Sequence, residues 1–139
     1  MSIVVMRAQA TVSHEAIAFF VREGNMLRMQ FAGGECAAGL RELKILVGEG
    51  LVGWVAESGQ AIVNGNPLVE QGYEPPEDAI LNSALAIPLQ GANGLLGVLA
   101  VYRRNRDAFS TLDAGALASL CRPLAHVLEN SQLTPAHAA

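Results

Sequence analysis

The sequence is poor in the residues that mark disulfide scaffolds, nucleic-acid binding and membrane insertion. It contains two cysteines, Cys36 and Cys121, whose separation matches no motif, and this indicates a reduced, cytoplasmic setting. Lys and Arg number 9 against 13 Asp and Glu, so the net charge of −4 offers no basic surface for nucleic acid. The opening residues, MSIVVMRAQ, are apolar over too few positions for a signal peptide or a membrane span. We therefore expect neither nucleic acid nor a membrane as a partner.

Sequence patterns for catalysis and metal binding are also absent. The histidines, His14, His126 and His137, have no spacing typical of metal ligands. The chain has no Gly-x-Ser-x-Gly motif, no phosphate-binding lysine loop and no Ser/His/Asp arrangement. We therefore expect no enzyme activity, no catalytic residue and no metal ligand. Four carboxylates gather in one Pro-containing loop, where we interpret them as solvated: Glu70, Glu74, Glu77 and Asp78.

What the chain does contain is enough apolar sequence for one domain with a hydrophobic core. Of its 139 residues, 51% are apolar and 16% are charged. Short apolar or alternating runs predict strands at residues 15–22, 27–31, 44–47, 61–66, 83–89 and 95–103. Longer periodic segments predict helices at residues 51–58 and 112–131. This order predicts an α+β fold with a central antiparallel β-sheet flanked by helices.

Each expected helix has an apolar face. In the shorter helix, Trp54 shares a face with Leu51 and Val55 at spacings of three and four, so we expect Trp54 to be mostly buried against the sheet. Gly59 is well placed to end this helix in the left-handed conformation. The apolar face of the longer helix is made of Leu117, Leu120, Cys121, Leu124, Val127 and Leu128.

Two segments carry a resemblance to a known family. GEGLVGWVAESGQAIVNGN, at residues 48–66, is followed by LNSALAIPLQGANGLLGVLAVYRRNRDAFS at residues 81–110. In this order they strongly resemble a GAF domain, and the resemblance covers residues 14–131. It implies a GAF/PAS-like sensor fold. Residues 1–13 then form an N-terminal segment, either a short irregular helix or a helix truncated from a longer chain, and residues 132–139 form a flexible tail.

The resemblance implies a ligand pocket between the sheet and the connecting helix and loop. It identifies no ligand and no cofactor, and the Asn-Lys-x-x-Phe-x-x-x-Asp-Glu signature of cyclic-nucleotide-binding GAF domains is absent here. The loop around Tyr73 is expected to form a lid over the pocket. The positions that match the pocket are Trp54, Ile62, Asn64, Tyr73, Asn82 and Ser83.

Three functions remain open on this resemblance. The first is a non-enzymatic bacterial sensor domain that binds a small ligand and regulates an attached output domain, such as a histidine kinase, a diguanylate cyclase or a phosphodiesterase. The second is a dimerisation module without a ligand. The third is a small thiol reductase of the methionine-sulfoxide type, which needs a second thiol close to Cys36.

The last helix is expected to mediate assembly. Its apolar face predicts a homodimer built on residues 112–131, with Arg122 and Glu129 at the rim of the interface. On the same face, Cys121 is expected to be a core residue that does not tolerate serine, whereas Cys36 is expected to tolerate substitution.

Overall fold

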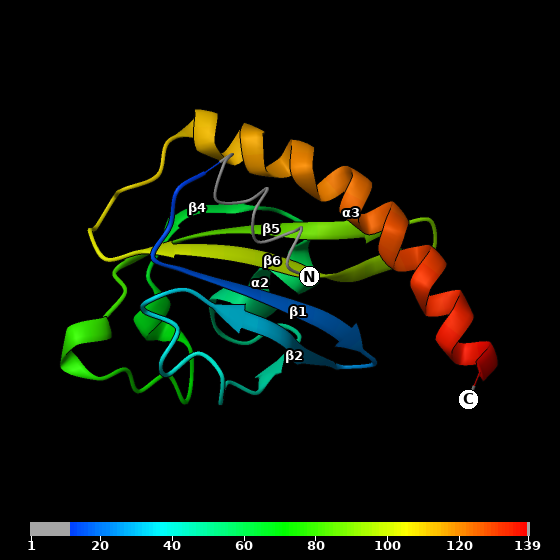
Figure 1. The fold of residues 1–139 in the computed structure, drawn as a ribbon, viewed down its shortest axis with the longest axis horizontal. Helices are drawn as coiled ribbons and strands as arrows, with labels where there is room; N and C mark the ends of the chain where they lie inside the picture. The colour runs from blue at the N-terminus through cyan, green and yellow to red at the C-terminus, as the bar shows by residue number, and fades with distance from the viewer. Residues whose placement is uncertain (1–11, 139) are drawn as a thin grey trace.

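The computed structural model describes residues 12–138, and it contains one antiparallel sheet with elements on both faces (Figure 1). The sheet has six strands in the order β3-β2-β1-β6-β5-β4. The strands are β1 (Ala16–Glu23), β2 (Met26–Gly33), β3 (Ile45–Leu46), β4 (Ile62–Gly65), β5 (Ser83–Gly91) and β6 (Gly94–Arg103). The helices are α2 (Gly50–Ser58) and α3 (Thr111–Ala138), with two short 3₁₀ turns, η1 (Pro67–Val69) and η2 (Glu77–Ala79). The predicted α+β architecture is confirmed.

The two faces of the sheet bury side chains of different size. Successive residues of a strand point to opposite faces, so the central strands β1, β5 and β6 supply both cores. The face toward α3 carries large aliphatic and aromatic side chains, among them Phe19, Leu85 and Leu99. The face toward α2 carries mostly alanines: Ala16, Ala18, Ala84, Ala86 and Ala100. These small side chains leave depth above the sheet for α2 and the loops.

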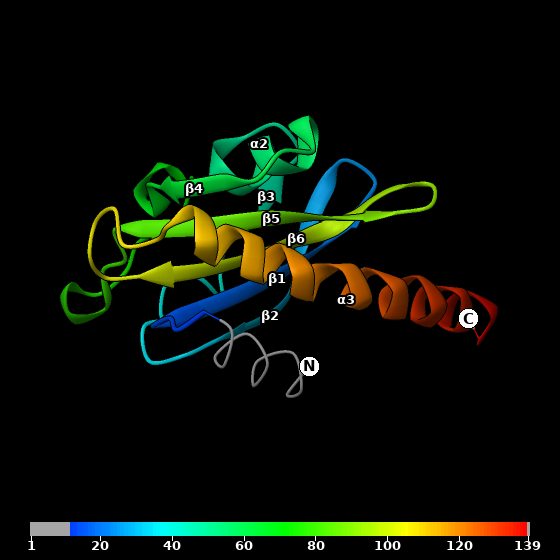
Figure 2. The ribbon, with the colours of Figure 1, turned by 90° about the horizontal axis from the view of Figure 1, so that it is seen from above.

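The elements outside the sheet divide between these two faces. Figure 2 shows α3 lying along β5, β6 and β1, while α2 lies on the other side of the sheet, close to β3 and β4. The loops at residues 34–44 and 66–80 lie on the side away from α3 (Figure 1). The segment 35–43, between β2 and β3, forms turns.

The ends of both helices have identifiable stop or start signals. Gly59 ends α2 in the left-handed conformation, with φ of 70° and its N–H bonded to the carbonyl of Val55 at 2.9 Å, as predicted. At the start of α3, Ser110 and Asp113 each bond the backbone N–H of the other, at distances of 3.2 and 2.9 Å. The helix α3 continues to Ala138, beyond the predicted end at residue 131.

The expectation that Trp54 is mostly buried is wrong. Its side chain is 42% exposed, whereas Leu51 and Val55 are 4% and 0% exposed. A helix advances 100° per residue, and the buried face of α2 is set by residue pairs four apart, Leu51 with Val55 and Val52 with Ala56. Trp54 lies beside that face, toward solvent. The spacing of apolar residues correctly predicted the helix, but it wrongly included Trp54 in the buried face.

Several N- and C-terminal expectations fall outside what the structure describes. Residues 1–11 are not described, so the expected N-terminal segment 1–13 is left almost wholly untested. The side chains of Leu128 and Glu129 are also outside the described residues. Within the described part of α3, Leu117 and Leu124 are buried against the sheet at 0% and 8% exposure. Much of the face expected to bind a second copy is therefore covered by the domain itself.

This burial pattern predicts unequal costs for two substitutions in α2. Leu51→Ala removes a fully packed side chain and should lower the free energy of unfolding by about 2–5 kcal/mol. Trp54→Ala should cost about 1 kcal/mol or less. Urea denaturation of the two variants gives both values, and iodide should quench the fluorescence of Trp54 in the folded protein. A Trp54→Ala cost equal to that of Leu51→Ala would contradict the structure.

Candidate functional site

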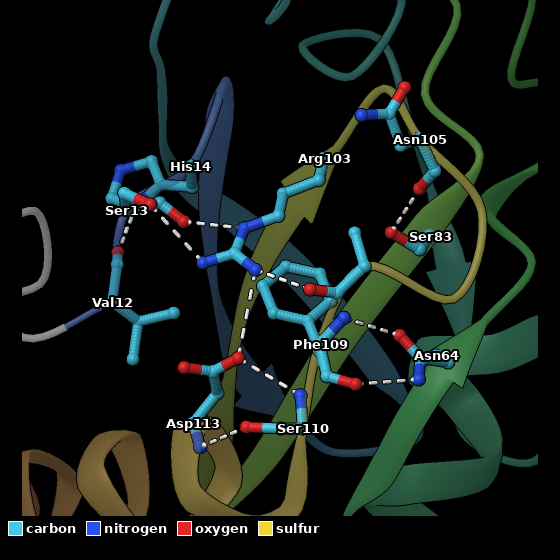
Figure 3. Close-up of polar contacts among 11 residues, drawn as sticks. Val12, Ser13, His14, Asn64, Ser83, Arg103, Asn105, Phe109, Ser110 and Asp113 are labelled. Atoms are coloured by element: carbon cyan, nitrogen blue, oxygen red, sulfur yellow. Dashed lines mark hydrogen bonds and ion pairs between the residues drawn. The ribbon is translucent and has the colours of Figure 1, made fainter.

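The six residues expected to line a pocket do not gather around one cavity. Asn64, Asn82 and Ser83 come together at the connection between β6 and α3, and Figure 3 shows Asn64 and Ser83 there. Tyr73 is buried in the core on the α2 side of the sheet, rather than forming a loose lid. Ile62 is half-buried on β4, where it pairs with Ala86. Trp54 lies toward solvent on α2.

Asn64, Asn82 and Ser83 all bind backbone groups of the β6–α3 connection. The side-chain amide of Asn64 donates to the carbonyl of Phe109 and accepts from its N–H, both at 2.8 Å (Figure 3). The Asn82 amide donates to the carbonyl of Arg104 at 2.8 Å, and the Ser83 hydroxyl donates to that of Asn105 at 2.7 Å. The three side chains therefore serve to position the β6–α3 connection.

Arg103 is the centre of the same region, and its role was not predicted from the sequence. Its guanidinium donates to the carbonyl of Ser13 at 2.8 Å and to the carbonyl of Ala108 (Figure 3). It lies 3.6 Å from the carboxylate of Asp113 and 4.4 Å from the ring centroid of Phe109. The end of β6 is thereby joined to the first turn of α3, so the two elements are expected to move together.

A second polar group lies on the opposite face of the sheet, at the start of α2. The carboxylate of Glu70 accepts the backbone N–H groups of Leu51 and Val52, at 2.8 and 3.2 Å. These two N–H groups belong to the first turn of α2, where no intrahelical acceptor exists, and Glu49 supplies no side-chain cap. Glu70 therefore caps a helix from 18 to 19 residues away in the sequence.

The contact between Glu70 and α2 depends on a glycine. Gly50 has a φ of +66°, a left-handed conformation that side chains rarely adopt. A β-carbon at this position would collide with a carboxylate oxygen of Glu70. The glycine at the start of α2 thus makes room for the carboxylate that caps the helix.

Glu70 is buried, contrary to the expectation that the whole acidic loop is solvated. Its side chain is 4% exposed, whereas Glu74, Glu77 and Asp78 are exposed as expected. Burial raises the pKa of Glu70 above its ordinary value, and the two N–H bonds oppose this rise only in part. A signal for this role existed in the sequence, because the start of α2 lacks the Ser, Thr, Asp or Asn that usually caps a helix.

Two tyrosines belong to the core on the α2 side of the sheet, where Glu70 caps α2. Tyr73 is buried, and its hydroxyl accepts the N–H of Leu81 at 3.3 Å. Tyr102 is fully buried, and its hydroxyl has no hydrogen-bond partner among the described residues. Burial raises the pKa of Tyr102, and the nearby charges of Glu70 and Tyr73 raise it further, so its phenol stays protonated. A buried donor without an acceptor is costly, and such groups deserve a functional explanation.

A cleft beside Glu70 opens this region to solvent. It has a volume of about 250 Å³. Glu70 and Gly50 form part of its wall, and Lys44 and Glu49 contribute one charge of each sign. Glu70 is therefore nearly buried and yet borders this cleft.

The two thiols of the protein lie on opposite faces of the sheet. Cys36 is fully buried in the core on the α2 side, where its sulfur accepts from Nε of Arg104 at 3.0 Å. Cys121 is buried on the α3 side, and burial raises the pKa of its thiol to about 12. The sheet separates the two thiols. Because both cysteines occupy core positions, we no longer expect Cys36 to tolerate substitution.

Two further features bear on the class of protein. Within residues 12–138, no three His, Cys, Asp or Glu side chains come together as metal ligands would. No helix in the same part of the chain has both the length and the apolar character needed to cross a bilayer.

The raised pKa of Glu70 predicts a pH dependence of stability. Its ordinary pKa is 4.5, so as the pH rises the unfolded chain loses the Glu70 proton before the folded protein does. The contribution of Glu70 to stability is thus complete below about pH 4.5 and decreases as the pH rises through the folded-state pKa. We expect the stability of the wild type relative to Glu70→Gln to decrease from pH 4.5 upward in urea denaturation. A difference that increases over this range would contradict the burial of this carboxyl.

Comparisons with known proteins identify the family. A family model described as GAF domain matches residues 2–129. No curated protein matches the sequence. The GAF domain of a phosphoenolpyruvate-protein phosphotransferase from Coxiella burnetii is similar in structure, with a TM-score of 0.76 at 20% identity over 96% of this chain and 82% of that one.

Two other solved structures extend the comparison. The GAF domain of a two-component sensor histidine kinase from Bacillus halodurans has a TM-score of 0.74 at 21% identity, covering 96% of this chain and 94% of that one. Free methionine-R-sulfoxide reductase from Neisseria meningitidis, solved in complex with its substrate, has a TM-score of 0.70 at 19% identity over 94% and 80% of the two chains. The likeness spans both regulatory domains and an enzyme. By its fold and by the family model that matches nearly its whole length, this chain belongs to the GAF domain family.

Proposed function

We propose that this chain is a non-enzymatic, cytoplasmic sensor module that binds a small ligand on the α2 side of its sheet. The observation that supports this proposal most is the buried polar group formed by Glu70, Tyr73 and Tyr102. Glu70 lines a cleft, and the two tyrosines belong to the core against the alanine-lined face of the sheet. A core that served packing alone would gain nothing from an unpartnered phenol.

The loop that carries Glu70 gives such a site a physical connection to α3. The loop runs between Asn64 on β4 and Asn82, just before β5. The side chains at both ends bind the β6–α3 connection, Asn64 at Phe109 and Asn82 at Arg104. A ligand that displaces the loop therefore acts on the residues that lead into α3, and a shift of this helix is the signal we propose.

The regulated partner is an output domain attached to the same polypeptide, such as a histidine kinase, a diguanylate cyclase or a phosphodiesterase. Two of the similar structures are GAF domains taken from a sensor histidine kinase and a phosphotransferase. Their identity to this chain is 20% and 21%, so the output domain itself is a proposal that follows from the family.

A reductase function is the less favoured alternative. It has one supporting observation, the similarity in fold to free methionine-R-sulfoxide reductase. Against it stands the separation of Cys36 and Cys121 by the sheet, because reduction of a sulfoxide by a thiol needs a second thiol to form the disulfide. Incubation with methionine-R-sulfoxide and a thiol reductant should give no methionine above the level of a Cys36→Ala variant.

A homodimer through α3 remains part of the proposal, with a changed interface. The sheet covers Leu117 and Leu124, so the surface open to a second copy is a groove of about 560 Å³ between α3 and β5. Small side chains form its α3 wall, among them Ala114, Gly115 and Ala118. Arg122, which was expected at the rim of the dimer, also lines this groove.

The sensor proposal predicts ligand-dependent stabilisation that depends on Glu70. In a thermal-shift screen of small metabolites, a ligand present at 100 times its Kd should stabilise the folded domain by about 2.7 kcal/mol. We expect Glu70→Gln to abolish the shift and Glu74→Gln, an exposed carboxylate of the same loop, to retain it. A library without any hit, together with unchanged dimerisation, would support the ligand-free dimerisation module instead.

The dimer proposal predicts a mass that depends on concentration and on the groove. Multi-angle light scattering of the wild type should show two chains per particle at high micromolar concentration. Ala118→Glu should give a single chain, because it places a charge in the groove. Asn25→Glu, in the exposed β1–β2 turn, should leave the mass unchanged. A wild type that stays monomeric at every concentration would refute the dimer.

A further inference from the structure

The sheet has an edge at β2 that β3 covers only in part. β3 has two residues and pairs only with Met26 and Leu27 of β2. β2 itself continues to Gly33, with β1 on its other side (Figure 1). On the outer side, which we call the β2 edge, no strand of the described chain pairs with Arg28–Gly33. An edge of this kind can accept an extended segment of another chain as a further strand.

The loop between β2 and β3 turns under the sheet instead of following the β2 edge. The N–H of Cys36 bonds the carbonyl of Glu15, ahead of β1, at 2.9 Å. Leu40 and Leu43 are buried in the core on the α2 side, and the N–H of Leu43 bonds the carbonyl of Leu40 at 3.1 Å. The chain therefore returns to the sheet only at Ile45, which explains why β3 is short.

A groove of about 460 Å³ lies beside the β2 edge. Its lining comes from β2, from the end of β1 and from residues 41–44 of the loop. Leu27 and Leu43 are buried in this lining, whereas Met29 is half-buried and Met26 is 44% exposed. Strand addition uses backbone bonds for affinity and contacts of alternate side chains for specificity, and this region offers both.

The charges of the groove favour an acidic partner. Five charged side chains line it: Arg28, Arg41, Lys44, Glu23 and Glu42. Because Glu23 is bonded to Arg28 at 2.7 Å, the exposed cations Arg41 and Lys44 remain against the single carboxylate of Glu42. The whole chain has a net charge of −4, so this local excess is opposite in sign to that of the molecule. Complementary charge of this kind selects partners and steers their approach.

A second copy of the chain fits the β2 edge less well than a separate segment does. β2 contains a bulge, because Phe19 and Phe20 of β1 lie opposite Phe31 and Met29, with Gln30 as the extra residue. Pairing β2 with the β2 of another copy would bring two bulged strands together. It would also bring the groove cations of one copy toward those of the other. A flexible acidic segment meets neither obstacle.

We propose that the β2 edge binds an extended acidic segment of a partner protein, which joins the sheet as a further strand. Backbone groups of Arg28–Gly33 pair with the segment. Its apolar side chains pack on the apolar lining of the groove, and its carboxylates meet Arg41 and Lys44. Glu70 does not line this groove, so the proposal does not depend on the proposed sensor function.

Fluorescence anisotropy with designed peptides tests the proposal. The probe is a labelled peptide of alternating Glu and Val, long enough to span the β2 edge. One control peptide has Lys in place of Glu, and another has the Glu and Val sequence with methylated backbone nitrogens. We expect only the probe to bind saturably, because Lys reverses the charge and methylation removes the N–H donors. Equal binding of either control peptide, or no binding of the probe, would overturn the proposal.

Variants of the protein separate the groove from other surfaces. Arg41→Glu combined with Lys44→Glu should weaken binding of the probe by about tenfold. Arg106→Glu, which reverses an exposed charge after β6, should leave binding unchanged, and an equal loss there would contradict the proposal. If the double variant does not fold, Arg41→Gln with Lys44→Gln replaces it, with a smaller loss expected. Glu70→Gln should bind the probe as the wild type does, and a loss there would assign the peptide to the cleft of Glu70 instead.

Amide hydrogen exchange locates the bound peptide. Outward N–H groups within Arg28–Gly33 should exchange more slowly with the probe bound than without it. The strand β4 at the opposite edge of the sheet is the matched control, and its exchange should not change. Slower exchange at β4, or no change at either edge, would refute strand addition at β2. Protection of the β2 edge that rises with protein concentration in the absence of the probe would assign the edge to a second copy and overturn the proposal.

Discussion

The capping of α2 by Glu70 is the contact on which this account of the domain depends. Two N–H groups in the first turn of α2 have no acceptor in the helix, and the carboxylate of Glu70 satisfies both. The contact joins a helix to a loop 18 to 19 residues further along the chain. It requires a glycine at position 50 and keeps a titratable group nearly buried. An uncharged partner could cap the helix without this desolvation, so the presence of a carboxylate calls for a functional reason.

Hydrogen bonds and an ion pair connect the loop of Glu70 to α3. The Glu70 loop is bound at both of its ends to the β6–α3 connection, through Asn64 and Asn82. Arg103 then links the end of β6 to Asp113 in the first turn of α3. The two faces of the sheet thus have separate tasks. The alanine-lined face packs against α2 and the loops, and the face with larger side chains packs against α3.

The sequence predicted the architecture well because the fold depends on periodic burial. The alternation in β1 and β6 and the left-handed Gly59 follow from local rules that residues obey within a few positions. The site was predicted less well, because it depends on contacts between distant residues. Asn64 and Ser83 were predicted to line a ligand pocket, whereas in the structure they bond backbone carbonyls that lie 45 and 22 residues further along the chain. Glu70 looked like one of four loop carboxylates, and only the uncapped start of α2 distinguished it. Trp54 shows the limit of predictions from residue spacing. In the nine-residue helix α2 it directly precedes the buried Val55 and is nevertheless exposed.

Amide hydrogen exchange at the start of α2 tests the central contact most directly. First-turn N–H groups of a helix normally exchange rapidly, because no carbonyl within the helix accepts them. If Glu70 caps α2, the amides of Leu51 and Val52 are protected in the wild type at neutral pH and lose that protection in Glu70→Ala, while the amide of Gly59 keeps its own bond to Val55 in both proteins. Exchange of Leu51 and Val52 at unprotected rates in the wild type would contradict the account.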